Sequence, residues 1–451
     1  MSAATNPKTI LFLSNLHDGQ LNPLLHIANA ITHSQPSTKI VVVASELHAN
    51  RIAETLPTAV FCPLQTAPDS VLARVKAGTF TAKEVEGPAG SVVTIAKNIT
   101  SIMPSPDIYA AEYNAVTATI ETYAPDVAVV DFVFFAGRNA VANKQIPFFC
   151  NVAFAPLNVI REQTWTATWN NPSSATGFGV DMTFLQKLYN IWFIVAQSAV
   201  GVVHFANLAY RVGKVGIKFY DLSHRAIRRD ARGIFINTVS EFEYPFPPSE
   251  NVIETGPLVS SFDEKDYDTW LDGHETVVFI GFGSVTKLDT NTVQKFLSVF
   301  ETVTQKYPSC AFLFKVGHTV DDIDENVIKS APENVRIVGF LQSQLATLNH
   351  PHVKVFASHC GGNGVHEGLY FGKPILGVPR WSDCYDFAQR VQDFGVGLRV
   401  NKAIPTIEVE EVEAKMLRLL IEPQFTKNAT EMMKKMRKSG VQIAVDAIMK
   451  N

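Results

Sequence analysis

The sequence is poor in cysteine and has no excess of basic residues. Its five cysteines, among 451 residues, show no CxxC spacing and no even-numbered disulfide framework, so we expect reduced thiols and a cytoplasmic location. The formal net charge is -4, which argues against binding to nucleic acid. Apolar residues make up 46% of the chain and charged residues 18%, which excludes global disorder.

Long apolar runs are also scarce. The stretch 1–15, MSAATNPKTILFLSN, has no basic start and an apolar run of only four residues, so it does not predict a secretory signal. Residues 189–206, YNIWFIVAQSAVGVVHFA, approach the length of a membrane span, but Asn190, Gln197 and His204 interrupt them. We expect a buried helix here; contact with a membrane surface and a wall of a ligand pocket are the alternatives.

Strand-like and helix-like runs alternate along the N-terminal part of the chain. Strands are expected at 10–15, 39–45, 127–133 and 147–154, with helices at 22–34 and 136–145 between them. Short runs of Val, Ile and Phe separated by helices predict βαβ units and a parallel sheet. The same alternation restarts with TVVFIGF at 276–282.

A segment rich in proline and acidic residues divides the chain. Residues 243–267, EYPFPPSENVIETGPLVSSFDEKDY, predict a linker between domains. We therefore expect an α/β fold with two tandem Rossmann-like, doubly wound domains, 1–242 and 268–425, facing a cleft. Ligands of such sheets bind outside the carboxyl ends of the strands, where loops run into helices.

A glycine-rich loop follows one strand of the second domain. A strand is expected to end at Ser358 and a helix to begin near Val365, with HCGGNG between them. Glycines let the backbone approach a ligand closely, and the first N–H groups of a helix favour an anion. The loop therefore predicts a phosphate cradle, to which His359 and Asn363 add side-chain donors.

A second strand-to-loop turn, VVFIGFGSV at 277–285, offers Gly281, Gly283 and Ser284 to the other side of one diphosphate. The dinucleotide fingerprint of an NAD-linked oxidoreductase needs a third glycine, and Thr286 stands in its place, which argues against that class. The histidines and cysteine near the first loop meet no zinc-ligand spacing, so no metal site is predicted.

The stretch 356–390 resembles the signature of family 1 glycosyltransferases, which is roughly HCGxNS followed by Glu, G-x-P and a D/E-Q pair. The matching residues are His359, Cys360, Gly361, Asn363, Glu367, Gly372, Pro374 and Asp383. Further matches run from GQLNPLL at 19, through PDVAVVDF at 125 and ETGPL at 254, to VGFLQSQLATLNHP at 338. The resemblance implies a GT-B fold, a UDP-sugar donor and an inverting reaction without metal or other cofactor. It also implies that the final segment, 426–451, returns to the N-terminal domain.

The resemblance further implies which residues bind the UDP-sugar. The diphosphate would be held by His359, Gly361, Asn363, Gly364, Gly283 and Ser284. The ribose would be bound by Glu367, and the uracil by residues among Phe340, Leu341 and Gln344. Asp383 would bind hydroxyls of the donor sugar, and its neighbour Cys384 stands where the family has Gln. A thiol cannot make the hydrogen bonds of an amide, so the sugar preference stays open. Gly364 stands where the family has Ser.

The acceptor hydroxyl must lose a proton, and the implied base is a histidine in the first loop that an aspartate orients. Asp131, in VAVVDF, matches the aspartate, whereas Gln20 stands where the histidine is expected. Because a neutral amide cannot take a proton, three readings stay open. In the first, His17 on the same loop is the base. In the second, Asp131 alone suffices, or an acidic acceptor ionises by itself. In the third, the protein is a pseudoenzyme that binds sugar nucleotides and transfers poorly.

The implied acceptor is a small, hydroxylated, lipophilic compound, typical of secondary metabolism, bound by the N-terminal domain. Its pocket has as candidate lining residues Trp165, Trp169, Phe178, Trp192 and Phe193, for each of which ordinary core packing is the alternative. A lipid glycosyltransferase attached to a membrane through 189–206 is a further reading. The sequence determines neither the acceptor nor the donor sugar nor the oligomeric state.

Overall fold

The computed structural model describes residues 8–15, 18–68, 70–77, 89–94, 96–97, 103–153, 165–245, 250–259, 262–283, 286, 288–317, 322–402, 404, 406–438 and 440–450.

The N-terminal sheet has seven parallel strands in the described part of the chain, in the order β3-β2-β1-β4-β5-β6-β7. They are β1 (Thr9–Leu13), β2 (Lys39–Ser45), β3 (Val60–Leu64), β4 (Val127–Asp131), β5 (Phe148–Val152), β6 (Gly233–Ile236) and β7 (Val252–Glu254). In β1, Ile10 and Phe12 join one core cluster, while Leu11 and Leu13 join another. Both faces of the sheet are therefore covered, which explains why its strands are apolar at successive positions.

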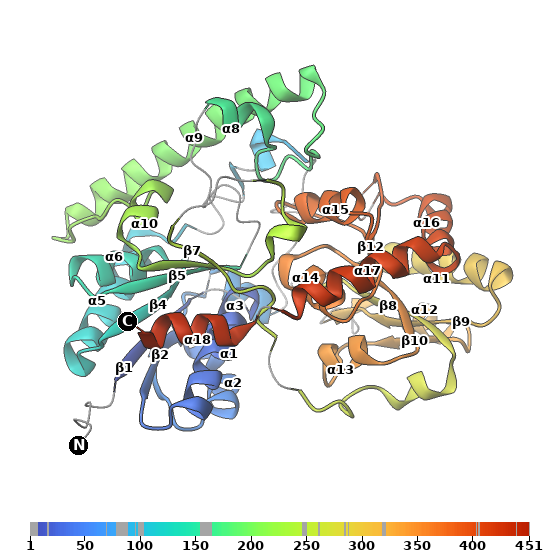
Figure 1. The fold of residues 1–451 in the computed structure, drawn as a ribbon, viewed down its shortest axis with the longest axis horizontal. Coiled ribbons are helices and arrows are strands. Elements are labelled where there is room, and N and C mark those ends of the chain that lie inside the picture. The colour runs from blue at the N-terminus through green and yellow to red at the C-terminus, as the bar shows by residue number, and fades with distance from the viewer. Residues whose placement is uncertain are drawn as a thin grey trace.

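The C-terminal sheet has six parallel strands among the described residues, in the order β10-β9-β8-β11-β12-β13. They are β8 (Thr276–Gly281), β9 (Cys310–Lys315), β10 (Val335–Val338), β11 (Val353–Ser358), β12 (Ile375–Gly377) and β13 (Gly397–Arg399). Helices lie on both sides of each sheet, and the two domains lie side by side (Figure 1). The predicted pair of doubly wound α/β domains is confirmed.

Helices connect these strands in both domains. Those that precede β8 are α1 (Asp18–Ser34), α2 (Ala49–Thr55), α3 (Val71–Lys76), α5 (Pro106–Tyr123), α6 (Phe135–Asn143), α8 (Trp165–Asn170), α9 (Phe184–Gly213) and α10 (His224–Asp230). Those that follow are α11 (Thr290–Lys306), α12 (Glu325–Lys329), α13 (Gln344–Asn349), α14 (Gly362–Tyr370), α15 (Cys384–Asp393), α16 (Val409–Ile421), α17 (Pro423–Met436) and α18 (Val441–Lys450).

Each sheet has one point where the chain reverses its direction of winding. In the first domain the chain winds outward from β1 to β3 and then returns to β4, on the other side of β1. In the second domain β8 and β11 are related in the same way. Loops at such a switch point diverge to opposite faces of the sheet and leave room for a ligand beyond the strand ends. A ligand site is therefore expected at the loops after β1, β4, β8 and β11.

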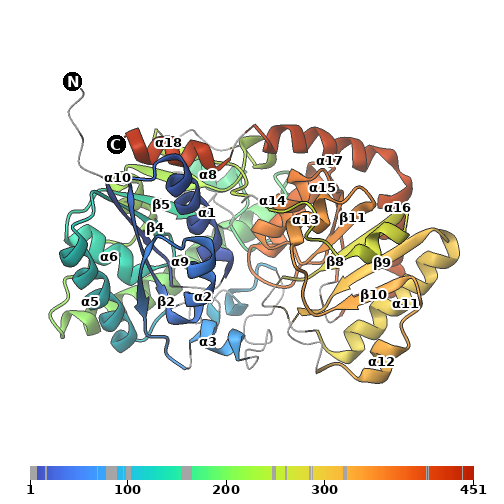
Figure 2. The ribbon, with the colours of Figure 1, turned by 90° about the horizontal axis from the view of Figure 1, so that it is seen from below.

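The domain boundaries differ in detail from the sequence-based ones. Strand β7 belongs to the N-terminal sheet although it lies inside the segment 243–267, expected to be a linker. Helix α17 packs against α14 of the C-terminal domain, and α18 packs against α1 of the N-terminal domain. Figure 2 shows α17 and α18 in succession along one side of the two domains. The return to the first domain is thus made by 441–450, later than position 426.

Helix α9 was expected to be buried over 189–206, and that expectation is wrong. Its N-terminus has a capping box, in which Thr183 accepts from the backbone of Gln186 and Gln186 from that of Thr183. Of its 30 residues only Asn190, Phe193, Leu208 and Val212 are buried. It is the one helix in the described part of the chain that is long and apolar enough to cross a membrane by length and composition. Tertiary packing covers one narrow face of α9 and leaves its other residues half-buried or exposed.

Candidate active site

The two domains meet at the beginnings of α1 and α14. The side-chain amide of Asn363, in the first turn of α14, donates a 2.9 Å hydrogen bond to the carbonyl oxygen of Gly19 in α1. A Cβ built on Gly362 would lie 3.2 Å from the carbonyl oxygen of Ala153, just past β5. The loop predicted as a phosphate cradle therefore faces the carboxyl-end loops of the N-terminal sheet.

The imidazole of His359 lies between two glycines. A Cβ on Gly283 would meet its Cε1 at 2.7 Å, and a Cβ on Gly361 would meet its Nε2 at 2.5 Å. Real Cβ atoms do not approach so closely, so any other residue at either position would displace the ring. Gly283 also has a φ of +76°, a backbone conformation that glycine adopts without strain. The two glycine loops thus converge on one side chain, His359, beyond the ends of β8 and β11.

Burial makes His359 a neutral group at pH 7. Desolvation, assisted by the positive charges of Lys315 and Arg380, lowers its pKa to about 4. Its Nδ1 is buried without a hydrogen-bond partner. A buried ring nitrogen beside two cations and the N-terminus of a helix is suited to an anionic ligand, which could accept from the ring and offset both charges.

Lys315, Gln344 and Glu367 form a chain of hydrogen bonds beside the cradle. The ammonium of Lys315, at the end of β9, donates to Gln344 Oε1 at 2.7 Å, and Gln344 Nε2 donates to Glu367 Oε2 at 2.7 Å. Burial raises the pKa of Glu367, while Gln344 and Lys315 oppose that shift. Gln344 was expected to contact uracil or ribose. Its hydrogen bond instead fixes the orientation of Glu367, the residue predicted to bind the ribose. Nothing in the sequence motif indicates Lys315, except that it ends an apolar strand.

The other described donor-side candidates lie in two places, the loop after β10 and the start of α15. Phe340 is 56% exposed, and Leu341 packs beside the apolar cluster around Phe356. Asp383 is the N-cap of α15 and half-buried. Cys384, by contrast, is fully buried in an apolar cluster that also contains Cys360. The buried thiol cannot reproduce the contacts that a glutamine would make with a sugar. Ser284 lies outside the described residues.

Asp131 ends β4 and is completely buried. One carboxylate oxygen accepts from the hydroxyl of Ser14 at 3.1 Å, and the other accepts from the backbone N–H of Val133 at 2.9 Å. Desolvation raises its pKa to about 7, despite these two hydrogen bonds and the charge of Arg138. Asp131 can therefore change its protonation state near neutral pH, as a general base requires.

A second buried carboxyl, Glu112, lies under the same loop, and no sequence pattern indicated it. It belongs to α5 and accepts a short hydrogen bond from the side-chain amide of Asn15. Burial raises its pKa to about 8, the hydrogen bond from Asn15 acting in the opposite direction. The adjacent residues Ser14 and Asn15 thus bind one buried carboxyl each, Asp131 and Glu112. These two contacts anchor the start of the loop that leads to 16–17.

Gln20 lies in the first turn of α1, because that helix begins at Asp18 rather than at the predicted residue 22. Its Oε1 is buried and has no hydrogen-bond partner. His17, the candidate base, lies outside the described residues. Asp18, one residue further on, forms ion pairs with His48 at 3.5 Å and Arg51 at 3.2 Å.

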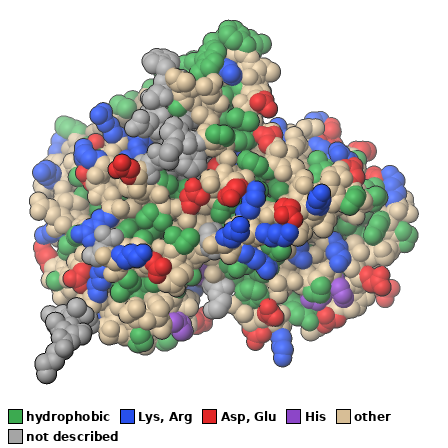
Figure 3. Space-filling view, in the orientation of Figure 1, with side chains coloured by type: hydrophobic (Ala, Val, Ile, Leu, Met, Phe, Trp, Pro, Cys, Tyr) green, Lys and Arg blue, Asp and Glu red, His purple; other side chains and the backbone are tan. Residues whose placement is uncertain are grey.

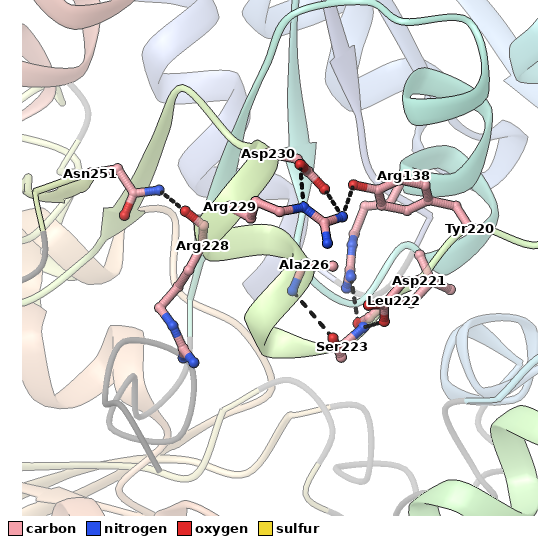
Figure 4. A network of polar contacts seen from close by, with 10 residues as sticks. All are labelled: Arg138, Tyr220, Asp221, Leu222, Ser223, Ala226, Arg228, Arg229, Asp230 and Asn251. Carbon is pink, nitrogen blue, oxygen red and sulfur yellow. Dashed lines mark hydrogen bonds and ion pairs between the residues drawn. The ribbon is translucent and has the colours of Figure 1, made fainter. Parts of the chain in front are cut away.

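Arg138 supports the segment that follows Asp131. Its buried guanidinium donates to the carbonyl oxygens of Phe132 at 2.6 Å and of Leu222 at 2.7 Å. Figure 4 shows this residue reaching toward the turn at Asp221–Ser223, next to the start of α10. The guanidinium therefore ties β4 to a distant part of the same domain. No motif in the sequence pointed to it.

The described candidate acceptor-pocket residues lie in different environments. Phe178 lines a small cavity with Asp386 and Arg390 at the domain interface. Trp169 packs edge-on against Phe184. The side chain of Trp165 lies outside the described residues. Of the two further candidates, Trp192 is 53% exposed and Phe193 is a core residue.

A second set of contacts joins the domains on the α15 side. The buried carboxylate of Asp386 accepts from the N–H groups of Ala175 at 2.6 Å and Gly177 at 3.0 Å, and from the hydroxyl of Ser174 at 3.0 Å. Nearby, Arg390 forms a buried ion pair with Glu243 at 3.0 Å. The segment 174–177, which precedes α9, is thereby fixed to the C-terminal domain.

Comparison with known proteins gives one family. The family model described as UDP-glucoronosyl and UDP-glucosyl transferase matches residues 24–440. UDP-glycosyltransferase 1 of Phaeomoniella chlamydospora is 29% identical over 208 residues, which are 44% of this chain and 42% of that protein. Anthocyanidin 3-O-glucosyltransferase of Solanum melongena is 31% identical over 164 residues, 35% of this chain and 37% of that protein. The chain thus spans less than half the length of these curated relatives.

Solved glycosyltransferase structures share the fold over nearly the whole chain. The glycotransferase of kitacinnamycin has a TM-score of 0.70 at 18% identity, with 99% of both chains covered. LpCGTa, solved in complex with UDP, has a TM-score of 0.65 at 18% identity, again with 99% of both chains covered. The predicted GT-B fold is confirmed.

Proposed function

Because the chain belongs to the UDP-glucoronosyl and UDP-glucosyl transferase family, we propose that it moves a hexose or pentose from a UDP-sugar to a hydroxyl of a small lipophilic acceptor, with inversion. The observation that carries the proposal is the position of His359 between Gly283 and Gly361. Two loops from neighbouring strands meet there at the start of α14, as binding of one diphosphate requires.

The proposed reaction divides its work between the domains. The leaving diphosphate gains negative charge, so the N–H groups at the start of α14 and the His359 ring are placed where stabilisation is needed. Glu367, held by Gln344 and Lys315, would bind the ribose. On the opposite side, Asp131, with its pKa near 7, would accept or relay the proton of the acceptor hydroxyl.

A non-catalytic role is the second candidate, and Gln20 is the observation that favours it. Its amide occupies the first turn of α1 with a buried, unpartnered Oε1 and cannot act as a base. A pseudoenzyme of this kind would bind sugar nucleotides through the same cradle without turnover.

We also propose that transfer needs no metal ion and takes place in the cytoplasm. Backbone and imidazole donors of the cradle would supply the stabilisation that a cation supplies elsewhere. The five cysteines are all unpaired, as is usual for proteins of a reducing compartment. Activity that survives EDTA would support the first statement, and activity restored only by an added divalent cation would contradict it.

The function is tested with a panel of UDP-sugars against phenolic, terpenoid and lipid acceptors, with products identified by mass spectrometry. Binding of UDP is measured in parallel by calorimetry. A glycosylated product that disappears in His359→Ala supports the transferase. Measurable UDP binding without any product, and product formation only in Gln20→His, would favour the pseudoenzyme. Absence of UDP binding would contradict both candidates.

A further inference from the structure

The outer face of α9 is an apolar surface that the proposed reaction does not use. Its exposed apolar side chains are Phe184, Leu185, Leu188, Tyr189, Trp192, Val195, Val202, Val203 and Tyr210. Leu185 is 75% exposed and Val202 67% exposed. Helix α9 lies along the upper edge of the N-terminal domain in Figure 1, and hydrophobic side chains gather at the top of the molecule in Figure 3. An exposed apolar surface of this extent marks an interaction site.

These side chains form one stripe. Leu185, Leu188, Trp192 and Val195 recur at intervals of three and four residues, and Val202 continues the pattern. Residues at this spacing share one face of a helix. The stripe thus runs along a helix of about 45 Å, at 1.5 Å per residue.

The opposite face of α9 is committed to the protein. The amide of Asn190 accepts from the backbone N–H of Ser173 at 2.7 Å and donates to the carbonyl oxygens of Thr168 and Asn171, both at 2.9 Å. Further along, Leu208 and Val212 belong to the core of the N-terminal domain. A helix held in this way along its length cannot cross a bilayer, but it can lie in the plane of one.

The charged residues of α9 itself are all basic. From residue 182 to residue 220 the chain contains no aspartate or glutamate. The basic residues Arg211, Lys214 and Lys218 lie exposed at or just beyond the C-terminal end of α9. Trp192, Tyr189 and Tyr210, three of the exposed aromatic residues, are of the types enriched at membrane–water interfaces. An anionic lipid surface complements these basic residues.

We propose that the outer face of α9 binds the surface of a membrane that contains anionic lipid. The apolar stripe enters the boundary between headgroups and acyl chains, and the basic residues at its C-terminal end contact the headgroups. The segment 174–177 precedes α9 and is bound by Asp386, so docking holds both domains at the bilayer. The proposal does not depend on the proposed transferase activity.

The test is co-sedimentation of the full chain with vesicles of phosphatidylcholine alone or mixed with phosphatidylserine. We expect binding to the mixed vesicles that weakens in high salt. The double variant Leu185→Glu/Val195→Glu should reduce the partition coefficient at least about ten-fold, because two side chains that enter the bilayer become charged. The matched control is Ile421→Glu, since Ile421 is 60% exposed on α16 of the other domain; it should bind as the wild type does.

Three outcomes would overturn the proposal. They are no sedimentation with either vesicle, equal binding of the α9 variant and the wild type, and a dimer in light scattering that the α9 variant dissociates while vesicles bind nothing. The last would assign the stripe to a second copy of the chain. Circular dichroism of each variant verifies that it is folded, and a second pair, Arg211→Glu/Lys214→Glu, tests the electrostatic part alone. Because no readout uses sugar transfer, failure here leaves the proposed function untouched.

Discussion

The carbonyl oxygen of Gly19 and the side-chain amide of Asn363 are joined by a 2.9 Å hydrogen bond across the domain interface. In a regular α-helix the carbonyl of Gly19 would accept from the N–H of residue 23. That residue is Pro23, inside α1, and proline has no N–H. The proline therefore leaves the Gly19 carbonyl available to the other domain. One residue of the predicted diphosphate cradle is thus bound to the helix that carries Gln20.

Pro23→Ala should weaken this link. The restored N–H at position 23 would compete for the Gly19 carbonyl, and a typical hydrogen bond contributes about 1 kcal/mol, or about a five-fold change in an equilibrium. We expect KM for the UDP-sugar to rise by up to that factor while the helix itself is not destabilised. A double-mutant cycle with Asn363→Ala is the check, since coupled residues give a non-additive result. Strict additivity would mean that the bond has no role in donor binding.

The cradle around His359 should be sensitive to a single methyl group at one position and tolerant at another. Gly361→Ala places a Cβ 2.5 Å from His359 Nε2, whereas Gly364→Ala places one 3.5 Å from Ser358 Oγ, an ordinary contact. We expect the first variant to lose UDP affinity strongly and the second to keep it. His359→Ala should raise the activation free energy of transfer by about 2.7–4 kcal/mol and so lower kcat, because this is the typical cost of removing a preorganised donor. Calorimetry with UDP and steady-state kinetics measure both effects, and equal affinities of the two glycine variants would refute the assignment.

The pH dependence of transfer should report Asp131. A base must be ionised to accept a proton, and the pKa of this buried carboxyl is raised to about 7. The value of kcat/KM should therefore rise with pH and level off above about 7. If Asp131 acts without a histidine, His17→Ala keeps this profile and Asp131→Asn abolishes turnover. Loss of turnover in His17→Ala would instead assign the base to His17.

Glu112→Gln should stabilise the protein, and more so at higher pH. The pKa of Glu112 is raised to about 8 in the folded protein. At pH values between the pKa of this residue in the unfolded chain and about 8, the unfolded state therefore binds fewer protons than the native state. The free energy of unfolding of the wild type therefore falls as pH rises through that range, by about 1.4 kcal/mol per unit of pKa difference. Glutamine retains an acceptor for Asn15 and carries no charge. The difference in Tm between variant and wild type should grow from pH 5 to pH 8, and a constant difference would show that burial does not perturb this carboxyl.

Much of the fold follows from local pattern. Apolar strands expected at 39–45 and 127–133 predict a parallel sheet covered on both faces, because a strand buried on one side only would alternate. The loop at 359–364 predicts an anion site, because glycines beside a helix start have few other uses. The beginning of α1 was placed too late, since Pro23 marks a typical first helical position although the helix begins one turn earlier.

Other features depend on contacts between residues far apart in the chain, which no local pattern contains. Glu112, on α5, is buried and bound by Asn15, a residue 97 positions earlier in the chain. Gln344 takes its orientation from Lys315 and Glu367, which lie on two other elements. The sequence by itself therefore determined the two sheets and the family, and it predicts the residues of the cradle. Only the tertiary structure decided which carboxyls are buried beside the first loop, how Asn363 meets Gly19, and that the apolar face of α9 is left exposed, since burial and pairing arise when distant segments pack.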